Sequence, residues 1–352
     1  MGFEHLLHET KEFNDDESLG YRSPKIIVVG CGGAGSNSVN RLSKMGVHGA
    51  EIYAINTDKA HLDRIQADNK VLIGGSITRG LGCGGMPDLG LKCAEQSEEE
   101  LRKVTSGADL VFITVGMGGG TGTGLAPYVA QLARRSRAVV VAIASTPFTV
   151  ERSRVARANH GLEKLRHSAD SVIVLDNNKL LEIVPNLPVN QAFGVMDQLV
   201  SEVVKGLTET ITMPSLINLD FADMRAIMCT GGTSTMLYAE NAADDPDMVV
   251  METMNNPLLD IDFTGANGAL IHLTSGPGLS LRTAHDVIRG ITDCLGENAN
   301  VIFGARVDKE YEGVIKVMTI ITGVKSPNLL SPNMGLVDHE VHEEMIGIPI
   351  VR

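Results

Sequence analysis

The sequence predicts an α/β protein built on a doubly wound parallel sheet, followed by a smaller α+β unit, and three observations support this fold class. Short apolar runs alternate with helical patterns through the first half of the chain. Two glycine-rich loops, at 30–35 and 118–124, each follow an apolar run and precede a helical pattern. The chain has 352 residues, of which 43% are hydrophobic, and this suits two domains with ordinary cores.

Six apolar runs predict the strands of the sheet. In chain order they are residues 25–30, 50–56, 70–73, 109–115, 138–144 and 171–175. Helical patterns at 37–45 and 125–134 follow the two glycine loops, and strands that alternate with helices form parallel sheets covered on both faces. Ligands of such sheets bind at the carboxyl ends of the strands.

A long amphipathic pattern over 189–212 predicts a central helix, which Pro214 ends. Beyond it we expect strands at 224–229, 268–275, 300–307 and 314–322, with helices near 234–241 and 281–295. The predicted organisation has five parts. They are a flexible extension (1–24), a ligand-binding domain (25–188), the central helix (189–213), an α+β domain that starts with a polar loop (214–325), and a flexible tail (326–352).

Composition limits the functional classes. The net charge of −13 argues against a nucleic-acid partner and against attraction to anionic lipid. The five cysteines show no paired spacing, which predicts a reduced, cytoplasmic environment. The acidic start lacks the apolar core of a signal peptide, and no run reaches the ~18 apolar residues of a membrane span, so we expect no direct membrane insertion.

The loop that follows the run 109–115 contains only glycine and threonine and predicts phosphate binding. Glycine tolerates positive φ and has no Cβ, so consecutive backbone N–H groups can converge on an anion. Threonine hydroxyls would add donors, and the next helix would offer its positive N-terminal end. A flexible turn is the alternative, but the position between strand and helix favours a phosphate site. The loop consists of Gly118, Gly119, Gly120, Thr121, Gly122, Thr123 and Gly124.

The other loop, GCGGAG at 30–35, matches the Rossmann-like dinucleotide fingerprint, and Asp58 lies where a ribose-binding acid would be. Alone it predicts an NAD(P)-dependent oxidoreductase, and this alternative stays open. Two glycine loops together favour a nucleoside triphosphate. The sequence contains no P-loop lysine motif, so phosphate charge must be balanced by Mg²⁺, helix ends and an arginine, either Arg152 or Arg154.

Five motifs resemble those of the tubulin/FtsZ superfamily of GTPases and, within it, the FtsZ family of cell-division proteins. In chain order they are NTD at 56–58, RGLGCGG at 79–85, GGGTGTG at 118–124, TPF at 146–148 and NLDFAD at 218–223. The resemblance extends from about residue 25 to residue 322 and is closer to archaeal than to bacterial members. It implies the tubulin/FtsZ fold and a GTP/GDP site with Mg²⁺ held mainly by phosphates and water, without a dedicated protein metal site.

The resemblance implies a role for each part of this site. Glu151 would bind the ribose with Arg154 nearby, Phe193 would stack on the base, and Asp197 would accept hydrogen bonds from guanine. Without the resemblance, Phe193 could be a core residue, Asp197 a solvated carboxylate, and Glu151 with Arg154 a surface pair. The other implied contacts are Gly32, Gly33, Ala34, Gly35, Asn37, Asn56, Asp58, Gly84, Gly85, Met86, residues 118–124, Pro147 and Asn177.

The resemblance places catalysis in the loop 218–223. Two carboxylates three residues apart, Asp220 and Asp223, otherwise predict a capping feature or a solvated turn. In this family the loop acts on the GTP of the next subunit in a head-to-tail filament, so the two aspartates would orient the attacking water and Asn218 would lie near a phosphate or the metal. Polymerisation would then activate the GTPase. A GTP-binding polymer without hydrolysis is the rival, against which the two aspartates argue.

The end of the tail predicts a peptide ligand. An apolar hexapeptide starts at Gly347 and ends at Arg352, and it resembles the motif with which FtsZ proteins bind membrane-tethering adaptors. A frayed terminus is the alternative. His339 and His342 lie among glutamates and predict a solvated helix face rather than a metal site. The implied location is the cytoplasmic division ring at mid-cell.

Overall fold

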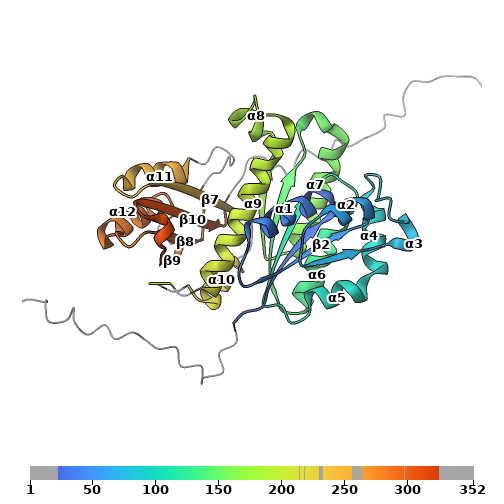
Figure 1. The fold of residues 1–352 in the computed structure, drawn as a ribbon, viewed down its shortest axis with the longest axis horizontal. Helices are drawn as coiled ribbons and strands as arrows, with labels where there is room; N and C mark the ends of the chain where they lie inside the picture. Colours follow the sequence, from blue (N-terminus) through green and yellow to red (C-terminus); the bar gives the residue numbers. More distant parts are fainter. Residues whose placement is uncertain are drawn as a thin grey trace, which may run out of the picture.

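The computed structural model describes residues 23–213, 215–217, 219–229, 233–255, 263, 265–296 and 298–324. Within these residues ten strands form one sheet, in the order β3-β2-β1-β4-β5-β6-β7-β10-β8-β9. Figure 1 shows a larger blue-to-green part and a smaller orange-to-red part of the molecule, with the helix α9 between them. The domain boundaries given above stay a prediction.

The first six strands run parallel and confirm the predicted doubly wound sheet. They are β1 (Ile26–Cys31), β2 (Ala50–Asn56), β3 (Asn69–Leu72), β4 (Leu110–Gly116), β5 (Val139–Thr146) and β6 (Ser171–Asp176). The order reverses between β1 and β4, and sheets of this type bind ligands at the carboxyl ends of the strands beside such a switch point.

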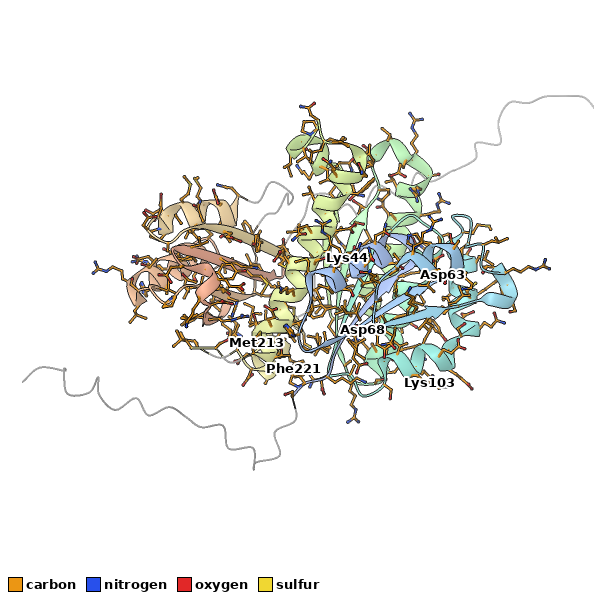
Figure 2. The ribbon with its side chains drawn as sticks, in the orientation of Figure 1. Lys44, Asp63, Asp68, Lys103, Met213 and Phe221 are labelled. Carbon is orange, nitrogen blue, oxygen red and sulfur yellow. The ribbon has the colours of Figure 1, made fainter. Side chains whose placement is uncertain are left out.

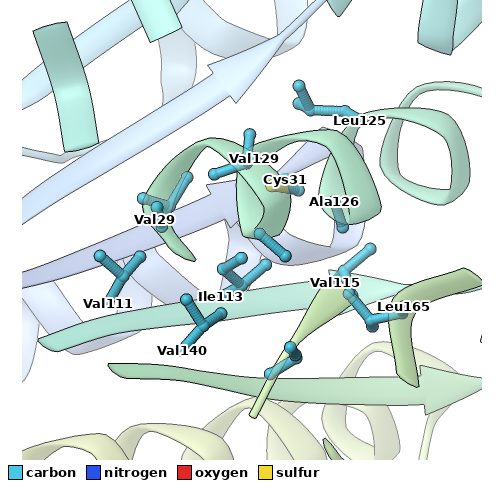
Figure 3. Packing of buried hydrophobic residues seen from close by; sticks show 14 of the residues in the cluster. Val29, Cys31, Val111, Ile113, Val115, Leu125, Ala126, Val129, Val140 and Leu165 are labelled. Carbon is cyan, nitrogen blue, oxygen red and sulfur yellow. The ribbon is translucent and has the colours of Figure 1, made fainter. Parts of the chain in front are cut away.

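Helices cover both faces of this parallel half, because alternate side chains of each strand enter two different cores. Val29 and Cys31 of β1 pack on one face with Leu125 and Val129 of α6 (Thr121–Arg135), as Figure 3 shows. On the other face, Val28 packs with residues of α1 (Gly32–Met45) and α9 (Val189–Thr212). Strands buried on both faces are nearly continuous apolar runs, which is why the sequence identified them so directly.

The remaining helices of this half connect its strands along the chain or follow the last of them. They are α2 (Lys59–Arg64), α3 (Gly75–Thr78), α4 (Pro87–Gln96), α5 (Glu98–Thr105), α7 (Arg152–Ser168), α8 (Lys179–Ile183) and the 3₁₀ turn η2 (Thr149–Glu151). Two helices start earlier than predicted. α1 begins at Gly32 instead of 37, and α6 begins at Thr121 instead of 125. The glycine-rich sequences therefore form the first helical turns and bring backbone N–H groups to the strand ends.

The second half of the sheet is formed by β7 (Thr233–Ala242), β8 (Gly268–Ser275), β9 (Asn300–Val307) and β10 (Val314–Thr322). β10 runs antiparallel to both β7 and β8, whereas β8 and β9 are parallel. The helices α11 (Pro246–Met254) and α12 (Leu281–Thr292) pack on this half, and the 3₁₀ turn η3 (Lys309–Tyr311) precedes β10. Two residue pairs, Val172↔Thr233 and Ile173↔Ser234, join β6 to β7.

Two predicted elements of the second half were wrong. The run 224–229 was expected to be a strand, but residues 224–228 lie in helix α10 (Phe221–Met228), which Asp220 caps, and Cys229 ends it. The run 234–241 was expected to be a helix, but it forms β7, whose backbone pairs with β10 along nine residues. The periodicity of a short apolar run does not distinguish a helix from a strand. Here the cap at Asp220 makes the first run a helix, and the pairing with β10 makes the second run a strand.

Several predictions concern residues outside the described ranges. These are the extension up to residue 22, the helix stop at Pro214, Asn218, and the tail from 325 onward with its histidines and terminal peptide. Among the helices of the described residues, none is both long and apolar enough to cross a membrane.

Candidate functional site

A cavity of about 760 Å³ opens where the carboxyl ends of β4 and β5 meet α1, α6 and α9. We call it the cleft. It brings together side chains and loops from sequence positions as distant as 33 and 200. The predicted site residues that line it are Gly33, Ala34, Asn37, Gly119, Gly120, Thr121, Gly122, Pro147, Glu151, Arg154, Asn177, Phe193 and Asp197.

The glycines of the two loops fall into two groups. A Cβ on Gly35 would lie 2.1 Å from the carbonyl oxygen of Thr114, and one on Gly30 would lie 2.4 Å from that of Gly35. These positions are glycine because α1 packs tightly against the sheet. A Cβ on Gly33 or Gly119 would meet nothing within 4 Å. Gly33 and Gly119 therefore leave open space at the cleft, where a ligand could approach the backbone.

The threonines of the 118–124 loop bond within the protein. The Oγ1 of Thr121 lies 2.7 Å from the Oγ1 of Thr57, and the Oγ1 of Thr123 accepts a hydrogen bond from the backbone N–H of Gly118 at 2.9 Å. The sequence suggested that these hydroxyls add donors for a phosphate. The structure shows both hydroxyls in contacts that hold the loop in shape. The Thr123 hydroxyl accepts in its contact, so its own proton is not used in that bond.

The loop with Gly84, Gly85 and Met86 packs against the 118–124 loop. A Cβ on Gly120 would lie 2.8 Å from the Cβ of Cys83 and 2.9 Å from the backbone nitrogen of Met86. Gly84 and Gly85 have φ of 56° and 77°, which favours glycine. None of these three residues lines the cleft in this structure, although Met86 is exposed beside it.

Further predicted residues lie behind the cleft wall. Asn56 is buried, and its Oδ1 accepts from the backbone N–H groups of Thr57 at 2.8 Å and Asp58 at 3.3 Å. Asp58 caps α2 by accepting from the N–H of His61 at 3.0 Å. The Asp58 carboxylate, which the dinucleotide fingerprint would assign to a ribose, is thus bonded to the protein backbone instead. The predicted residues that do not line the cleft are Gly32, Gly35, Asn56, Asp58, Gly84, Gly85, Met86, Gly118, Thr123 and Gly124.

A chain of side-chain contacts orients Asn37. His61 places Nδ1 3.3 Å from the Nδ2 of Asn56 and Nε2 3.1 Å from the Oδ1 of Asn37. Because the Oδ1 of Asn56 accepts from the backbone, its Nδ2 must donate to His61, and Nδ1 of the imidazole must accept. Nε2 then carries the proton and donates to Asn37. The free amide group of Asn37 at the cleft is therefore its NH₂ donor.

Phe193 and Asp197 lie at the α9 wall of the cleft. Phe193 is 40% exposed and makes an edge-to-face contact with Phe148, with ring centroids 5.8 Å apart, so it is not a core residue. Asp197 accepts a hydrogen bond from the Oγ of Ser38 at 2.7 Å. Burial raises the pKa of Asp197, while the Ser38 hydroxyl and the charge of Arg41 act in the opposite direction.

Asn177 offers an unused acceptor at the same cleft. Its side chain is buried, and its Oδ1 has no hydrogen-bond partner among the described residues. Buried polar atoms are nearly always paired in folded proteins, so such an atom in a cleft marks a position where a ligand donor fits. The cleft therefore combines an exposed aromatic ring and a carboxylate on α9 with a free carbonyl oxygen just after β6.

Glu151 and Arg154 form an ion pair that lines the cleft. The Nη1 of Arg154 lies 2.5 Å from the Oε2 of Glu151, and the other carboxylate oxygen accepts from the N–H of Phe148 at 3.1 Å. The hydrogen bond from Arg154 lowers the pKa of Glu151. Arg154 lines the cleft and Arg152 does not, which favours Arg154 in the choice that the sequence left open.

The sequence did not identify the full α1 wall of the cleft. Ser38, Asn40, Arg41 and Lys44 line it together with Asn37. Residues 34, 37, 38, 41 and 44 share one face of a helix, and four of them lie inside the predicted helix 37–45, but their place at the cleft depends on contacts that form only in the folded chain. Lys44 is labelled on α1 in Figure 2. Further lining residues that the sequence missed are Thr114, Val115, Gly116, Met117, Ile143, Ser145, Thr146, Asn190, Gly194, Met196 and Val200.

The two predicted catalytic aspartates lie apart from the cleft, beyond the C-terminal end of α9. Asp220 is the N-cap of α10 and Asp223 is in the first turn of that helix. Neither lines the cleft. Figure 2 labels Met213, which follows α9, and Phe221, which begins α10, at this end of the molecule. Among the described residues, no group of three or more His, Cys, Asp or Glu side chains could hold a metal ion.

Two family models match the chain. The GTPase domain of the Tubulin/FtsZ family matches residues 25–185, and the C-terminal domain of the FtsZ family matches residues 225–325. Cell division protein FtsZ 2 of Halobacterium salinarum is 54% identical over 89% of this chain and 80% of its own length. Cell division protein FtsZ 2 of Methanocaldococcus jannaschii is 52% identical over 92% of this chain and 85% of its own length.

Solved structures agree with these matches. An empty FtsZ dimer from M. jannaschii superposes with a TM-score of 0.80 and 40% identity, covering 99% of this chain and 97% of the other. A GTPγS-bound protofilament of CetZ2 from Haloferax volcanii gives a TM-score of 0.75 at 24% identity, covering 87% and 96% of the two chains. The second likeness shows the shared fold alone.

Proposed function

Because the chain belongs to the tubulin/FtsZ family, and within it to the FtsZ cell-division GTPases, we propose that it forms head-to-tail filaments and hydrolyses GTP between neighbouring subunits. Each GTP would be bound in the cleft of one subunit and attacked under the control of Asp220 and Asp223 of the next. The comparisons do not support the oxidoreductase interpretation of the loop at 30–35.

The observation that carries this proposal is the separation of the two aspartates from the cleft. From Asp197 to Thr212 the helix α9 continues for fifteen residues, or about 22 Å at 1.5 Å per residue. Asp220 and Asp223 follow that end of the helix and do not line the cleft. They can therefore act on a nucleotide only if another subunit presents its cleft to them.

The α9 wall supports guanine as the base. A guanine ring presents two neighbouring donors, N1–H and the N2 amino group. Asp197 would accept from them, and the unpartnered Oδ1 of Asn177 supplies a further acceptor. Phe193 is exposed at the same wall and would stack on the base. Glu151 would bind the ribose hydroxyls.

The opposite side of the cleft supports phosphate binding. Gly33 and Gly119 leave room for close approach to the backbone, and α1 and α6 present their N-terminal ends there. Arg154, whose backbone adjoins Gly118, would provide positive charge there in a protein whose net charge is −13. Mg²⁺, bound through phosphate oxygens and water, would neutralise charge that develops on the phosphates.

Catalysis would depend on positioning. Phosphoryl transfer to water requires the attacking oxygen to be in line with the leaving group, and carboxylates can orient and polarise that water. Asp220 and Asp223 would supply this, and Asn218 would act on a phosphate or the metal. The FtsZ dimer of M. jannaschii is consistent with self-association in this family. The apolar peptide from Gly347 to Arg352 would bind an adaptor that tethers the filament at the division ring.

The test is to measure the GTPase rate per molecule against protein concentration, with sedimentation in parallel. We expect a threshold concentration, above which the rate per molecule and the sedimented fraction rise together. A rate that stays constant from monomer to filament would refute the shared site. Filaments that sediment with GTP but release no phosphate would favour the non-hydrolysing polymer instead.

A further inference from the structure

Asp197 is held from two sides by serines of the α1–α9 contact. The Oγ of Ser38 donates to the Oδ1 of Asp197 at 2.7 Å, and the Oγ of Ser201 donates to the backbone carbonyl of Asp197 at 2.7 Å. Ser201 also lies 3.4 Å from the backbone oxygen of Ser38. Both hydroxyls are nearly buried, with 8% and 1% of their residues exposed. The side chain and the backbone of Asp197 are therefore each fixed by one hydroxyl.

Ser38 gives its single proton to Asp197. A hydroxyl has one hydrogen to donate, and the competing acceptor, the carbonyl oxygen of Ala34, is 3.4 Å away. The contact from Ser38 to Asp197, at 2.7 Å, is clearly shorter than the 3.4 Å contact to Ala34. Hydrogen bonds to a carboxylate are also shorter and stronger than those to a neutral acceptor. Ser38 thus engages one carboxylate oxygen, and the other stays available in the cleft.

The ionisation state of this carboxyl group decides which base it fits. A carboxylate accepts two hydrogen bonds and matches N1–H and the N2 amino group of guanine. A protonated carboxyl group offers one donor and one acceptor and matches N1 and the N6 amino group of adenine. Burial raises the pKa of Asp197, and Ser38 counteracts that shift together with Arg41. The other charged side chains that line the cleft are Lys44, Glu151 and Arg154.

We infer that Ser38 is a specificity-determining residue, which positions Asp197 and keeps it an acceptor so that the cleft prefers guanine over adenine nucleotides. This inference rests on the proposed function, since it takes the cleft to be the GTP site. Ser38 acts through Asp197 and is a positioning residue. It couples α1, which begins beside the phosphate end of the cleft, to α9, which bears the base-binding side chains.

The experiment compares the affinities of GTP and ATP for the full chain, below the concentration at which it assembles. For Ser38→Ala we expect GTP to bind about tenfold more weakly, the effect of one hydrogen bond to a charged group, with ATP affinity unchanged or higher. Ser38→Thr retains the hydroxyl and should restore the preference. Ser136→Ala is the matched control, because Ser136 donates to the carbonyl of Leu132 outside the cleft.

The pH profile provides a second measurement. Because Ser38 lowers the pKa of Asp197, its removal should raise the pH at which the ratio of GTP to ATP affinity begins to fall on acidification. An unchanged ratio and pH profile in Ser38→Ala, with the wild type still selective for GTP, would overturn the role of Ser38 alone. A wild type without preference for GTP would instead refute the proposed function. If Ser38→Ala does not fold, Ser38→Cys, which keeps the volume with a weaker donor, should show an intermediate shift.

Discussion

Asp220 and Asp223 cap each other. The backbone N–H of Asp223 donates to the Oδ1 of Asp220 at 2.7 Å, and the N–H of Asp220 donates to the Oδ2 of Asp223 at 3.4 Å. This reciprocal arrangement holds the start of α10 and orients both carboxylates before any ligand binds. The capping interpretation and the catalytic one are therefore compatible, since the same two side chains can do both.

Substitutions at Asp220 separate the two roles. Asparagine is as good an N-cap as aspartate, so Asp220→Asn should leave stability unchanged, whereas Asp220→Ala should cost about 1 kcal/mol in the free energy of unfolding. Both variants should bind GTP and sediment, and both should hydrolyse it slowly, as should Asp223→Ala. The measurements are urea unfolding and phosphate release from sedimented filaments. Normal turnover in Asp220→Asn or Asp223→Ala would remove that residue from catalysis.

Gly119 and Gly124 belong to the same loop but differ in the space around them, so substitutions at the two positions can be compared. A Cβ on Gly119 meets nothing within 4 Å, whereas one on Gly124 would lie 2.2 Å from the carbonyl oxygen of Pro87. We expect Gly119→Ala to fold normally and to bind GTP about tenfold more weakly, because its methyl group enters the ligand space. Gly124→Ala should instead lower the free energy of unfolding by about 1 to 3 kcal/mol. Equal effects of both variants on stability would contradict this division of the loop.

His61 should affect nucleotide binding through Asn37. His61→Phe keeps the ring but loses the donor to Asn37, and we expect about fivefold weaker GTP binding, which corresponds to one neutral hydrogen bond. His61→Gln can still donate and should bind nearly as the wild type does. In an Asn37→Ala background, His61→Phe should have no further effect on the affinity. Additive losses in this double-mutant cycle would show that His61 acts by another route.

His272 makes stability depend on pH. It is 5% exposed in β8, and burial, followed by the charges of Arg306 and Lys316, lowers its pKa to about 4. An unfolded histidine has a pKa of about 6.5, so between these values the unfolded chain binds a proton that the native chain does not. The stabilising contribution is present above about pH 6.5 and is lost as the pH falls towards 4.

Urea unfolding at pH 7 and pH 5 checks this expectation. The wild type should lose about 2 kcal/mol more than His272→Gln between the two values, at about 1.4 kcal/mol per pH unit below 6.5. The carboxylates titrate in both proteins and cancel in the comparison. Parallel losses in the two proteins would show that His272 is not the group responsible.

The parallel half of the fold was predictable because its signals are local. Buried strands such as β4 are continuous apolar runs, and α9 has the predicted bounds, since its apolar residues repeat at helical spacing. The second half was harder to predict for the opposite reason: the segment of β7 was predicted to be a helix, and that of α10 a strand. Their identities depend on the pairing of β7 with β10 and on the cap at Asp220, and neither is visible in a window of six to eight residues.

The candidate site was predictable where a side chain belongs to a motif or has a role that the family resemblance implies. Thirteen of the expected residues line the cleft, Phe193, Asp197 and Arg154 among them. Ser38 and Arg41 were missed because they lie on the turns of α1 beyond the fingerprint and matter only through their contact with α9. His61 was missed because its partners, Asn37 and Asn56, are 24 and 5 residues away in sequence and meet only in the folded chain.

The length of the helix α9 also affects the direction in which Asp220 points relative to the cleft at the other end of the helix. Each residue of an α-helix turns the chain by about 100° and advances it by 1.5 Å. By helix geometry alone, one residue inserted between Asp197 and Thr212 would turn the C-terminal end of α9 by roughly a quarter of a turn relative to its cleft-lining residues, whereas four inserted residues would nearly restore the angle and add about 6 Å. The direction in which one subunit presents Asp220 to the next therefore depends on the number of residues in α9, which must agree with the pairing of β6 and β7.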